Sequence, residues 1–290
     1  MKSIGDEQTA VVAFVAMSVL AGGNAVAIRY SNRELEPLWG AALRFALAAT
    51  LLGAVMLALR LTLPRGPALS GAILYGALGI GGAFALAYYG LVEIHAGLGQ
   101  TLLALVPLAT LFLAVVQRQE LLRAGAVVGG AVALAGIAVM SNATIREDLP
   151  LLSLLAILGS ALCFAQAAIL VRRFPPVHPV TMNAVGMAAG ALLLLVGALL
   201  AGETLELPEE TETWLAVAYL VPIGSVLVFV LYIVVLRYWT ASRAAYEFVL
   251  IPLVTIALSA WLDDEPITVE LLLGGLLVLT GVYVGALRRA

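Results

Sequence analysis

Long apolar stretches alternate with short polar connectors along the whole chain. A helix needs about 20 apolar residues to cross the hydrocarbon core of a bilayer, and each stretch is roughly that long. The connectors, such as 60–67, 172–179 and 203–212, carry charges or proline and are too short to hold a soluble domain. The pattern therefore predicts an all-α integral membrane protein with ten transmembrane helices. The predicted helices cover residues 9–29, 37–59, 69–92, 96–116, 122–140, 150–171, 179–201, 214–236, 241–262 and 268–287.

The amino-acid composition supports this interpretation. Hydrophobic residues make up 63% of the chain and charged residues 11%, whereas a soluble domain is roughly half apolar and about a quarter charged. This excess indicates that lipid is the solvent of the folded chain. The first apolar stretch is longer than the apolar region of a typical signal peptide, so we interpret it as a retained helix. Cys163 is the only cysteine, which excludes an intrachain disulfide.

Basic residues are divided unequally between the two ends of the predicted helices. Eleven of the 15 Lys and Arg residues fall at the two termini and in alternate connectors, and three fall on the opposite face. Because cytoplasmic connectors carry an excess of Lys and Arg, we expect a multi-pass protein of the cell inner membrane with both termini in the cytoplasm. Acidic residues gather on the external face, at Glu203, Glu206, Glu209, Glu210, Glu212, Asp263, Asp264 and Glu265.

The first five predicted helices resemble the last five. The segment LVPLAT at 105–110 returns as LIPLVT at 250–255. Prolines, glycines and polar residues of the two halves match at an offset of 142 residues in the first two helices and 145 in the next three. An odd number of helices per half forces the second half into the membrane in the opposite orientation, which is common in secondary transporters. We therefore expect a repeat at 1–145 and a second, inverted repeat at 146–290.

Several short motifs occur in the order and spacing of a known family. They are the ALRF segment at 42–45, the two proline segments, and Glu120 and Glu265 after the fourth and ninth helices. With the glycine-rich fifth and tenth helices, they resemble the drug/metabolite transporter superfamily, in particular its ten-helix members built from two EamA domains. The resemblance covers nearly the whole chain and is greatest for bacterial amino-acid and metabolite exporters. It implies alternating access and a central cavity lined mainly by helices 1, 3, 4, 6, 8 and 9.

Two prolines are candidate hinges. Pro107 and Pro252 lie near the middle of helices 4 and 9. Proline removes a backbone hydrogen bond and clashes with the carbonyl four residues earlier, here that of Leu103 or Phe248. Inside a membrane such a carbonyl is tolerated where protein or cavity water satisfies it. The prolines either form hinges for alternating access or fixed kinks that improve packing.

Three charged residues are candidate gate or substrate contacts, because an ionisable group inside a membrane is a functional candidate. Glu247 contacts a substrate or a proton, or it pairs with Arg243 one turn earlier. Arg44 binds a substrate carboxylate or extends outward to Glu34 or Glu36. The family that the chain resembles shares this arginine, which favours a structural role for it.

Amides, tyrosines and glycines supply the other cavity candidates. Asn24 and Gln166 are equivalent amides of helices 1 and 6, and Gln100 lies nearer a helix end. Each amide either joins helices or contacts a substrate. Residues at three- and four-residue steps share one face of helix 3, where they line a cavity or pack in the core. The further candidates are Tyr75, Gly79, Gly82 and Tyr89, together with Tyr88 and Tyr246.

These features predict a secondary transporter of small metabolites, above all an amino-acid exporter. A drug or other metabolite carrier of the same fold is the alternative, and a lipid-modifying membrane enzyme is the alternative from another class. The chain contains no HExxH, GxSxG or GxxxxGK[ST] motif. We expect no cofactor, metal or nucleic-acid partner. GxxxG spacings, such as Gly186 with Gly190, let helices pack closely; we expect a monomer, with a dimer as the alternative.

Overall fold

The computed structural model describes residues 4–118, 124–144, 150–239, 244, 247–264 and 266–284. In its first half, five helical spans follow one another, and three of them are divided into shorter elements. The elements are α1 (Ile4–Ala21), α2 (Asn24–Ser31), α3 (Pro37–Ala58), α4 (Pro67–Tyr75), η1 (Gly76–Gly82), α5 (Ala83–Glu93), α6 (Ala96–Leu103), α7 (Val106–Val116) and α8 (Ala124–Thr144).

The second half repeats this order of spans. The predicted fold of ten helices is thereby confirmed, including the short join between the third and fourth helices at 94–95. The elements are α9 (Leu151–Val171), α10 (Pro179–Ala201), α11 (Thr211–Tyr219), η3 (Leu220–Leu227), α12 (Val228–Tyr238), α14 (Glu247–Leu262) and α15 (Val269–Val282).

The surface of the helices suits a bilayer. Within the described residues, seven helical spans are long and apolar enough to cross a membrane, and two further apolar helices are shorter. Large apolar side chains point outward, and those of Val12, Leu57 and Leu200 are 69, 74 and 84% exposed. In a bilayer such side chains contact acyl chains, whereas on a soluble monomer they would form an extended apolar patch. The chain is therefore an all-helical membrane protein.

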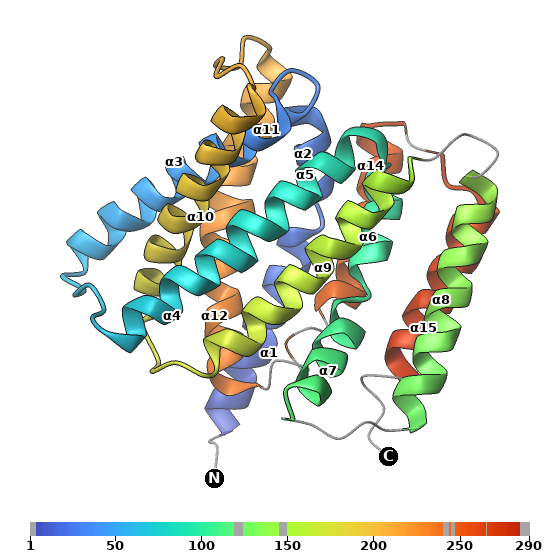
Figure 1. Ribbon diagram of the computed structural model, residues 1–290, viewed down its shortest axis with the longest axis horizontal. Helices are drawn as coiled ribbons and strands as arrows, with labels where there is room; N and C mark the ends of the chain where they lie inside the picture. The colour runs from blue at the N-terminus through green and yellow to red at the C-terminus, as the bar shows by residue number, and fades with distance from the viewer. Residues whose placement is uncertain are drawn as a thin grey trace.

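The two halves pack against each other in a two-fold pattern (Figure 1). α3 packs against its counterpart α10, and α8 against its counterpart α15. α1 contacts α12 as its counterpart α9 contacts α5, and α1 contacts α14 as α9 contacts α7. Replacing each helix by its counterpart in the other half gives the same set of contacts, as expected for two inverted five-helix repeats. The start of α1 and the end of α15 lie on the same side of the molecule in Figure 1, as an even number of crossings requires.

Glycines allow the closest helix crossings inside the chain. A Cβ atom added to Gly76 would lie 2.6 Å from the Cα of Gly186, and one added to Gly190 would lie 2.6 Å from the side chain of Ile80. Lipid supplies no hydrophobic drive for helix association, so close van der Waals contact takes its place. The spacing of Gly186 and Gly190 therefore serves packing between α10 and η1.

Irregular backbone interrupts several spans near the interface of the halves. η1 and η3 are π-helical segments at equivalent positions of the two repeats. The breaks are not equivalent, because the first span is interrupted at 22–23 and the fourth at 104–105, while α9 and α14 are continuous at the matching positions. Non-helical backbone at membrane depth requires protein or a cavity around it, and π segments often occur at functional sites.

Side chains of the second half satisfy the carbonyls that the break in the first span leaves free. The Tyr219 hydroxyl donates to the Leu20 carbonyl, and the Thr255 hydroxyl donates to the Gly22 carbonyl at 2.7 Å. Among the described residues, the hydroxyl of Thr110, which is equivalent to Thr255, bonds only the carbonyl four residues earlier in its own helix, at 2.8 Å. Contacts across the repeat interface therefore stabilise this break.

Candidate functional site

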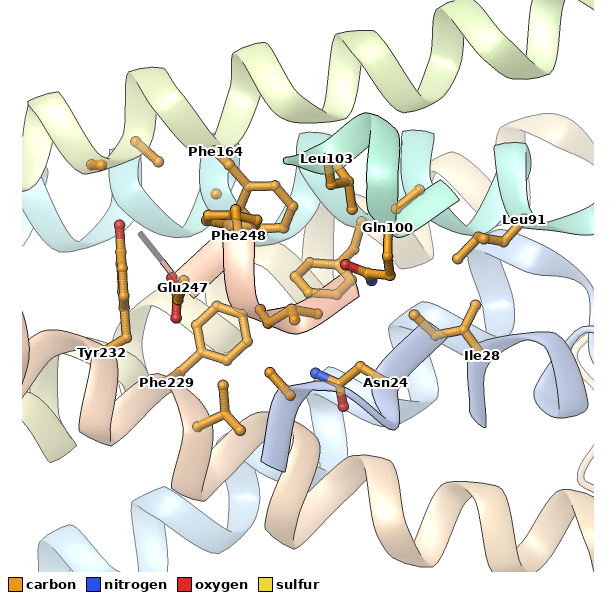
Figure 2. Close-up of a pocket in the computed structure, with 18 of the residues that line it drawn as sticks. Asn24, Ile28, Leu91, Gln100, Leu103, Phe164, Phe229, Tyr232, Glu247 and Phe248 are labelled. Carbon is orange, nitrogen blue, oxygen red and sulfur yellow. The ribbon is translucent and has the colours of Figure 1, made fainter. Parts of the chain in front are cut away.

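A cavity lies between the repeats, beside both helix breaks (Figure 2). Its lining comes from helices 1, 3, 4, 6, 8 and 9, the six that the family resemblance implies. About 80 Å³ of it is open to the centres of water molecules. One water needs roughly 10–15 Å³ by this measure, so the cavity accommodates a small solute.

Phenylalanines form the middle of the cavity. Phe84 and Phe229 occupy equivalent positions of the two repeats, and their ring centroids lie 5.8 Å apart. Phe164 lies 5.4 Å from Phe84 and 5.5 Å from Phe248 by the same measure. These separations and tilted ring planes are favourable for aromatic pairs. The cavity therefore has an apolar, aromatic waist contributed by both halves.

Two amides with free hydrogen-bonding capacity mark one end of the cavity. The Asn24 Nδ2 donates to the Gly224 carbonyl at 3.3 Å, while its buried Oδ1 has no partner within the described part of the chain. Gln100, 8% exposed, points into the cavity from α6 (Figure 2). Its side chain forms no hydrogen bond with the described residues. The Gln100 amide can therefore bind a polar group of a solute, whereas Asn24 Oδ1 is enclosed by protein atoms.

A carboxyl group and two phenols mark the other end. Glu247 begins α14, is 5% exposed and lies beside Tyr232 (Figure 2). Tyr75 and Tyr232 line the same cavity. The Tyr75 hydroxyl donates to Asn183 Oδ1 at 3.2 Å, and Asn183 Nδ2 donates to the Phe229 carbonyl at 2.9 Å. This end is therefore fixed to the aromatic waist.

Arg44 joins helix 2 to helix 8. Its side chain is fully buried; Nε donates to the Ser225 hydroxyl at 2.7 Å, and Nη2 donates to the Gly224 carbonyl at 2.9 Å. The guanidinium also lies 4.8 Å from the ring centroid of Phe45 and 4.9 Å from that of Phe84. Arg44 therefore holds η3 against the aromatic waist. It lies behind the cavity lining and does not extend outward to the acidic loops.

Ion pairs close the side of the molecule that lies uppermost in Figure 1, which we call the acidic face. It comprises the loops that follow α2, α10 and α14. Asp263, whose side chain is 6% exposed, accepts from Arg29 Nε at 3.2 Å and from Arg33. Arg29 also donates to the Ile94 carbonyl at 2.9 Å, and Arg33 pairs with Glu212 at 3.3 Å. We call these four side chains the Asp263 latch.

Glu34 binds another loop of the second half at this face. Its carboxylate accepts hydrogen bonds from the backbone N–H groups of Glu209 and Glu210. The Glu209 N–H in particular lowers the pKa of Glu34 from its ordinary value of 4.5, because these bonds favour the ionised form. The latch and Glu34 together tie the α2–α3 loop of the first repeat to the second repeat.

The described structure separates the candidates that the sequence proposed. Five line the cavity: Asn24, Tyr75, Gly79, Gln100 and Glu247. Four lie outside the cavity lining: Gly82, Tyr88, Tyr89 and Gln166. Gln166 accepts a hydrogen bond from Gln117 at 2.7 Å, and Tyr89 is 44% exposed. Tyr246 and Arg243 lie outside the described residues.

The two candidate hinge prolines differ in backbone geometry. Pro107 stands at the start of α7, directly after the break at 104–105. Pro252 lies inside the continuous helix α14. Equivalent sequence positions therefore have different backbone, and only Pro107 lies at an interruption within the described residues.

The sequence analysis did not select the phenylalanines or Tyr232. The sequence does mark two of the phenylalanines, because Phe84 and Phe229 match at the same offset of 145 as the proline segments. Phenylalanine is common in apolar helices, so only the alignment of the halves distinguishes these two. The Asp263 latch left no comparable signal, because its members come from three segments far apart in the sequence.

Known proteins share both the sequence and the fold of this chain. Residues 8–142 and 151–286 each match the EamA-like transporter family. The uncharacterized transporter YyaM of Bacillus subtilis is 27% identical over 93% of this chain and 91% of its own. The uncharacterized inner membrane transporter YedA of Escherichia coli K12 is 27% identical over 94 and 89%. A solved crystal structure has a TM-score of 0.71 at 21% identity, over 98% of this chain and 99% of that chain, which shows a shared fold.

Proposed function

The chain belongs to the EamA-like transporter family and is a secondary transporter; we propose that it exports amino acids by alternating access through the cavity between its repeats. One observation carries the proposal. A cavity built by both repeats has an aromatic waist and, at its two ends, Gln100 and Glu247, which form no hydrogen bond with the described residues. Such a site matches a small zwitterion with an apolar side chain, since a few placed polar groups orient a ligand in a mostly apolar pocket.

The polar groups favour amino acids over anionic metabolites. Gln100 supplies N–H donors for a carboxylate at one end of the cavity, while Glu247 accepts from an ammonium group at the other. The lining contains no Lys, Arg or His among the described residues. A phosphate-bearing substrate would need such cations, and the nearest buried arginine, Arg44, already binds Gly224 and Ser225.

The distribution of charge supports an orientation in the membrane. The acidic face carries few Lys or Arg residues, and the opposite face carries most of them. By the positive-inside rule, the acidic face is external and both termini are cytoplasmic. The relative YedA is described as an inner membrane transporter, which supports the same membrane for this chain. Repeats at 1–145 and 146–290 acting within one monomer suffice for the proposed cycle.

The helix breaks supply the moving parts. Repeat-related packing gives the two halves equivalent roles, whereas the interruptions at 22–23 and 104–105 occur only in the first half of the described chain. Pro107 lies beside one of them and is the proposed hinge. In this structure the Asp263 latch closes the acidic face above Ile28 and Leu91, which line that end of the cavity.

Counterflow in proteoliposomes tests the proposal. Vesicles loaded with one unlabelled amino acid should take up the same labelled amino acid, and the screen should cover apolar, aromatic, polar and charged members. Gln100→Leu should raise the KM by roughly tenfold, about the value of one hydrogen bond to a charged group. Gln166→Leu is the matched control, because this amide lies outside the cavity lining, and its KM should stay within about twofold of wild type.

Two outcomes would contradict the proposal. Absence of counterflow for every amino acid would exclude amino acids as the substrates. Equal effects of the Gln100 and Gln166 substitutions on KM would show that the cavity is not the substrate path. Transport of bulky apolar cations in place of amino acids would favour a drug carrier of the same fold.

A further inference from the structure

Glu247 is a buried carboxyl group without an opposite charge beside it in the described part of the chain. It is 5% exposed and lines the cavity. It forms no ion pair or hydrogen bond with the described residues. A buried, unpaired carboxylate is strongly unfavourable, so the group is either protonated or neutralised by a cation that enters the cavity. Arg243, one turn earlier in the sequence, lies outside the described residues and is addressed by the experiment below.

The groups that face Glu247 suit an ammonium ion. Tyr75 and Tyr232 line the same cavity from α4 and α12, and Tyr232 lies beside Glu247 (Figure 2). Phe248 follows it on α14, with its ring against that of Phe164. Aromatic faces attract cations, most strongly where water is excluded. Arg44 is held at η3, behind the lining, and does not pair with Glu247.

We propose that Glu247, Tyr75 and Tyr232 form a site that binds either the substrate's ammonium group or a proton, and that this competition couples export to proton entry. The coupling rests on the proposed amino-acid function, whereas the ammonium site does not depend on it. The site lies at the end of the cavity remote from Gln100 (Figure 2), which leaves the amide end for a carboxylate.

The exchange balances in atoms and charge. With the cavity open to the cytoplasm, Glu247 gives its proton to water and its carboxylate binds the ammonium group. With the cavity open to the acidic face, the ammonium group leaves and the carboxylate takes a proton from water on that side. Only the O–H bond of Glu247 forms and breaks. One zwitterion leaves for each proton that enters, so each cycle moves one positive charge inward.

Binding of simple probes tests the ammonium site. Phenethylamine carries an ammonium group without a carboxylate, and 3-phenylpropionate carries the reverse. Phenethylamine should protect the purified wild-type protein against thermal unfolding. Its apparent Kd should rise about tenfold for each unit by which the pH is lowered, once the carboxyl group is mostly protonated. The reason is that the proton and the ligand compete for one group. 3-Phenylpropionate should bind at least tenfold more weakly.

Variants identify the group that titrates. Glu247→Gln should weaken phenethylamine binding at least tenfold and remove its pH dependence, while Glu247→Asp should restore both. Glu270→Gln, an exposed carboxyl group on α15, should behave as wild type. Binding to the wild type that does not change with pH would overturn the site. So would an Arg243→Gln variant that binds phenethylamine at least tenfold more tightly than the wild type, because an internal ion pair would then neutralise Glu247 in the wild type.

Transport separates this inference from the proposed function. In proteoliposomes, an imposed pH gradient should drive accumulation of labelled phenylalanine by wild type and Glu270→Gln but not by Glu247→Gln. Accumulation by Glu247→Gln equal to that of wild type would overturn the coupling. If no amino acid is carried at all, the proposed function fails, and pH-dependent binding of phenethylamine still decides whether the ammonium site exists.

Discussion

Replacement of Asp263 by Asn is expected to open the acidic face. The Asp263 carboxylate accepts from Arg29 at 3.2 Å and from Arg33, and its side chain is only 6% exposed. Asparagine keeps the shape and one acceptor oxygen but removes the negative charge that holds two arginines together. The segments that carry these residues then lose a charged connection across the two repeats.

The magnitude follows from burial. A hydrogen bond to a charged group contributes about 1.5–3 kcal/mol, so removing the charge shared by Arg29 and Arg33 should cost the closed state about 2 kcal/mol. Every 1.4 kcal/mol changes an equilibrium about tenfold, so the open population should rise about 30-fold. Within the described part of the chain Glu212 pairs with Arg33 alone, and these two side chains are 69 and 50% exposed. Because such surface pairs contribute about 0.2–1 kcal/mol, Glu212→Gln should change the population about twofold.

Labelling of a cysteine beneath the latch measures this population. Ile28 is 3% exposed and lines the cavity below Arg29. In a background of Cys163→Ala, which removes the only native cysteine, Ile28→Cys should react slowly with a membrane-impermeant maleimide added on the acidic side. Asp263→Asn should raise the labelling rate about 30-fold and Glu212→Gln about twofold.

A labelling rate for Asp263→Asn no higher than that of Glu212→Gln would refute the reasoning. It would show that the buried carboxylate contributes no more to closure than an exposed one. Thermal unfolding of both variants in detergent, compared with the parent, distinguishes opening from loss of the fold, because a gate variant keeps a cooperative transition.

Three further predictions concern packing, the helix break and pH. Gly76→Val should sharply reduce folded yield, because the added Cβ meets the α10 backbone. Gly53→Val should fold normally, since a Cβ added there meets no described neighbour within 4 Å outside its own helix backbone. Size-exclusion chromatography compares the folded yields of the two variants. Thr255→Val should lower stability by about 1–3 kcal/mol by leaving a carbonyl unsatisfied at the helix break, and Thr110→Val should lower it less; detergent unfolding that ranks them equally would contradict this. The depressed pKa of Glu34 stabilises the fold above the ordinary carboxyl value of 4.5, and this contribution is lost as pH falls through the lower folded-state pKa. Glu34→Gln should therefore flatten the acid limb of the stability profile measured by thermal unfolding, and an unchanged limb would exclude the role of Glu34.

Much of the fold could be predicted from the sequence because hydropathy and repetition are properties of the chain itself. The length of the apolar stretches gave the helices, and the matched segments at 105–110 and 250–255 gave the two repeats. The candidate site was predicted less completely. The amides Asn24 and Gln166 occupy equivalent positions, yet Asn24 lines the cavity and Gln166 bonds Gln117 outside it.

The sequence by itself determined how many helices form, how they are repeated and which polar residues lie within them. Only the tertiary structure decided which face of each helix meets the cavity, where Pro107 and Pro252 diverge, and that Arg29, Arg33 and Asp263 meet. The physical reason is the solvent. Lipid is as apolar as a protein core, so hydrophobicity sorts residues by segment but not by face. Which face of a helix meets the cavity therefore depends on close packing and on the few polar atoms that must find hydrogen-bond partners.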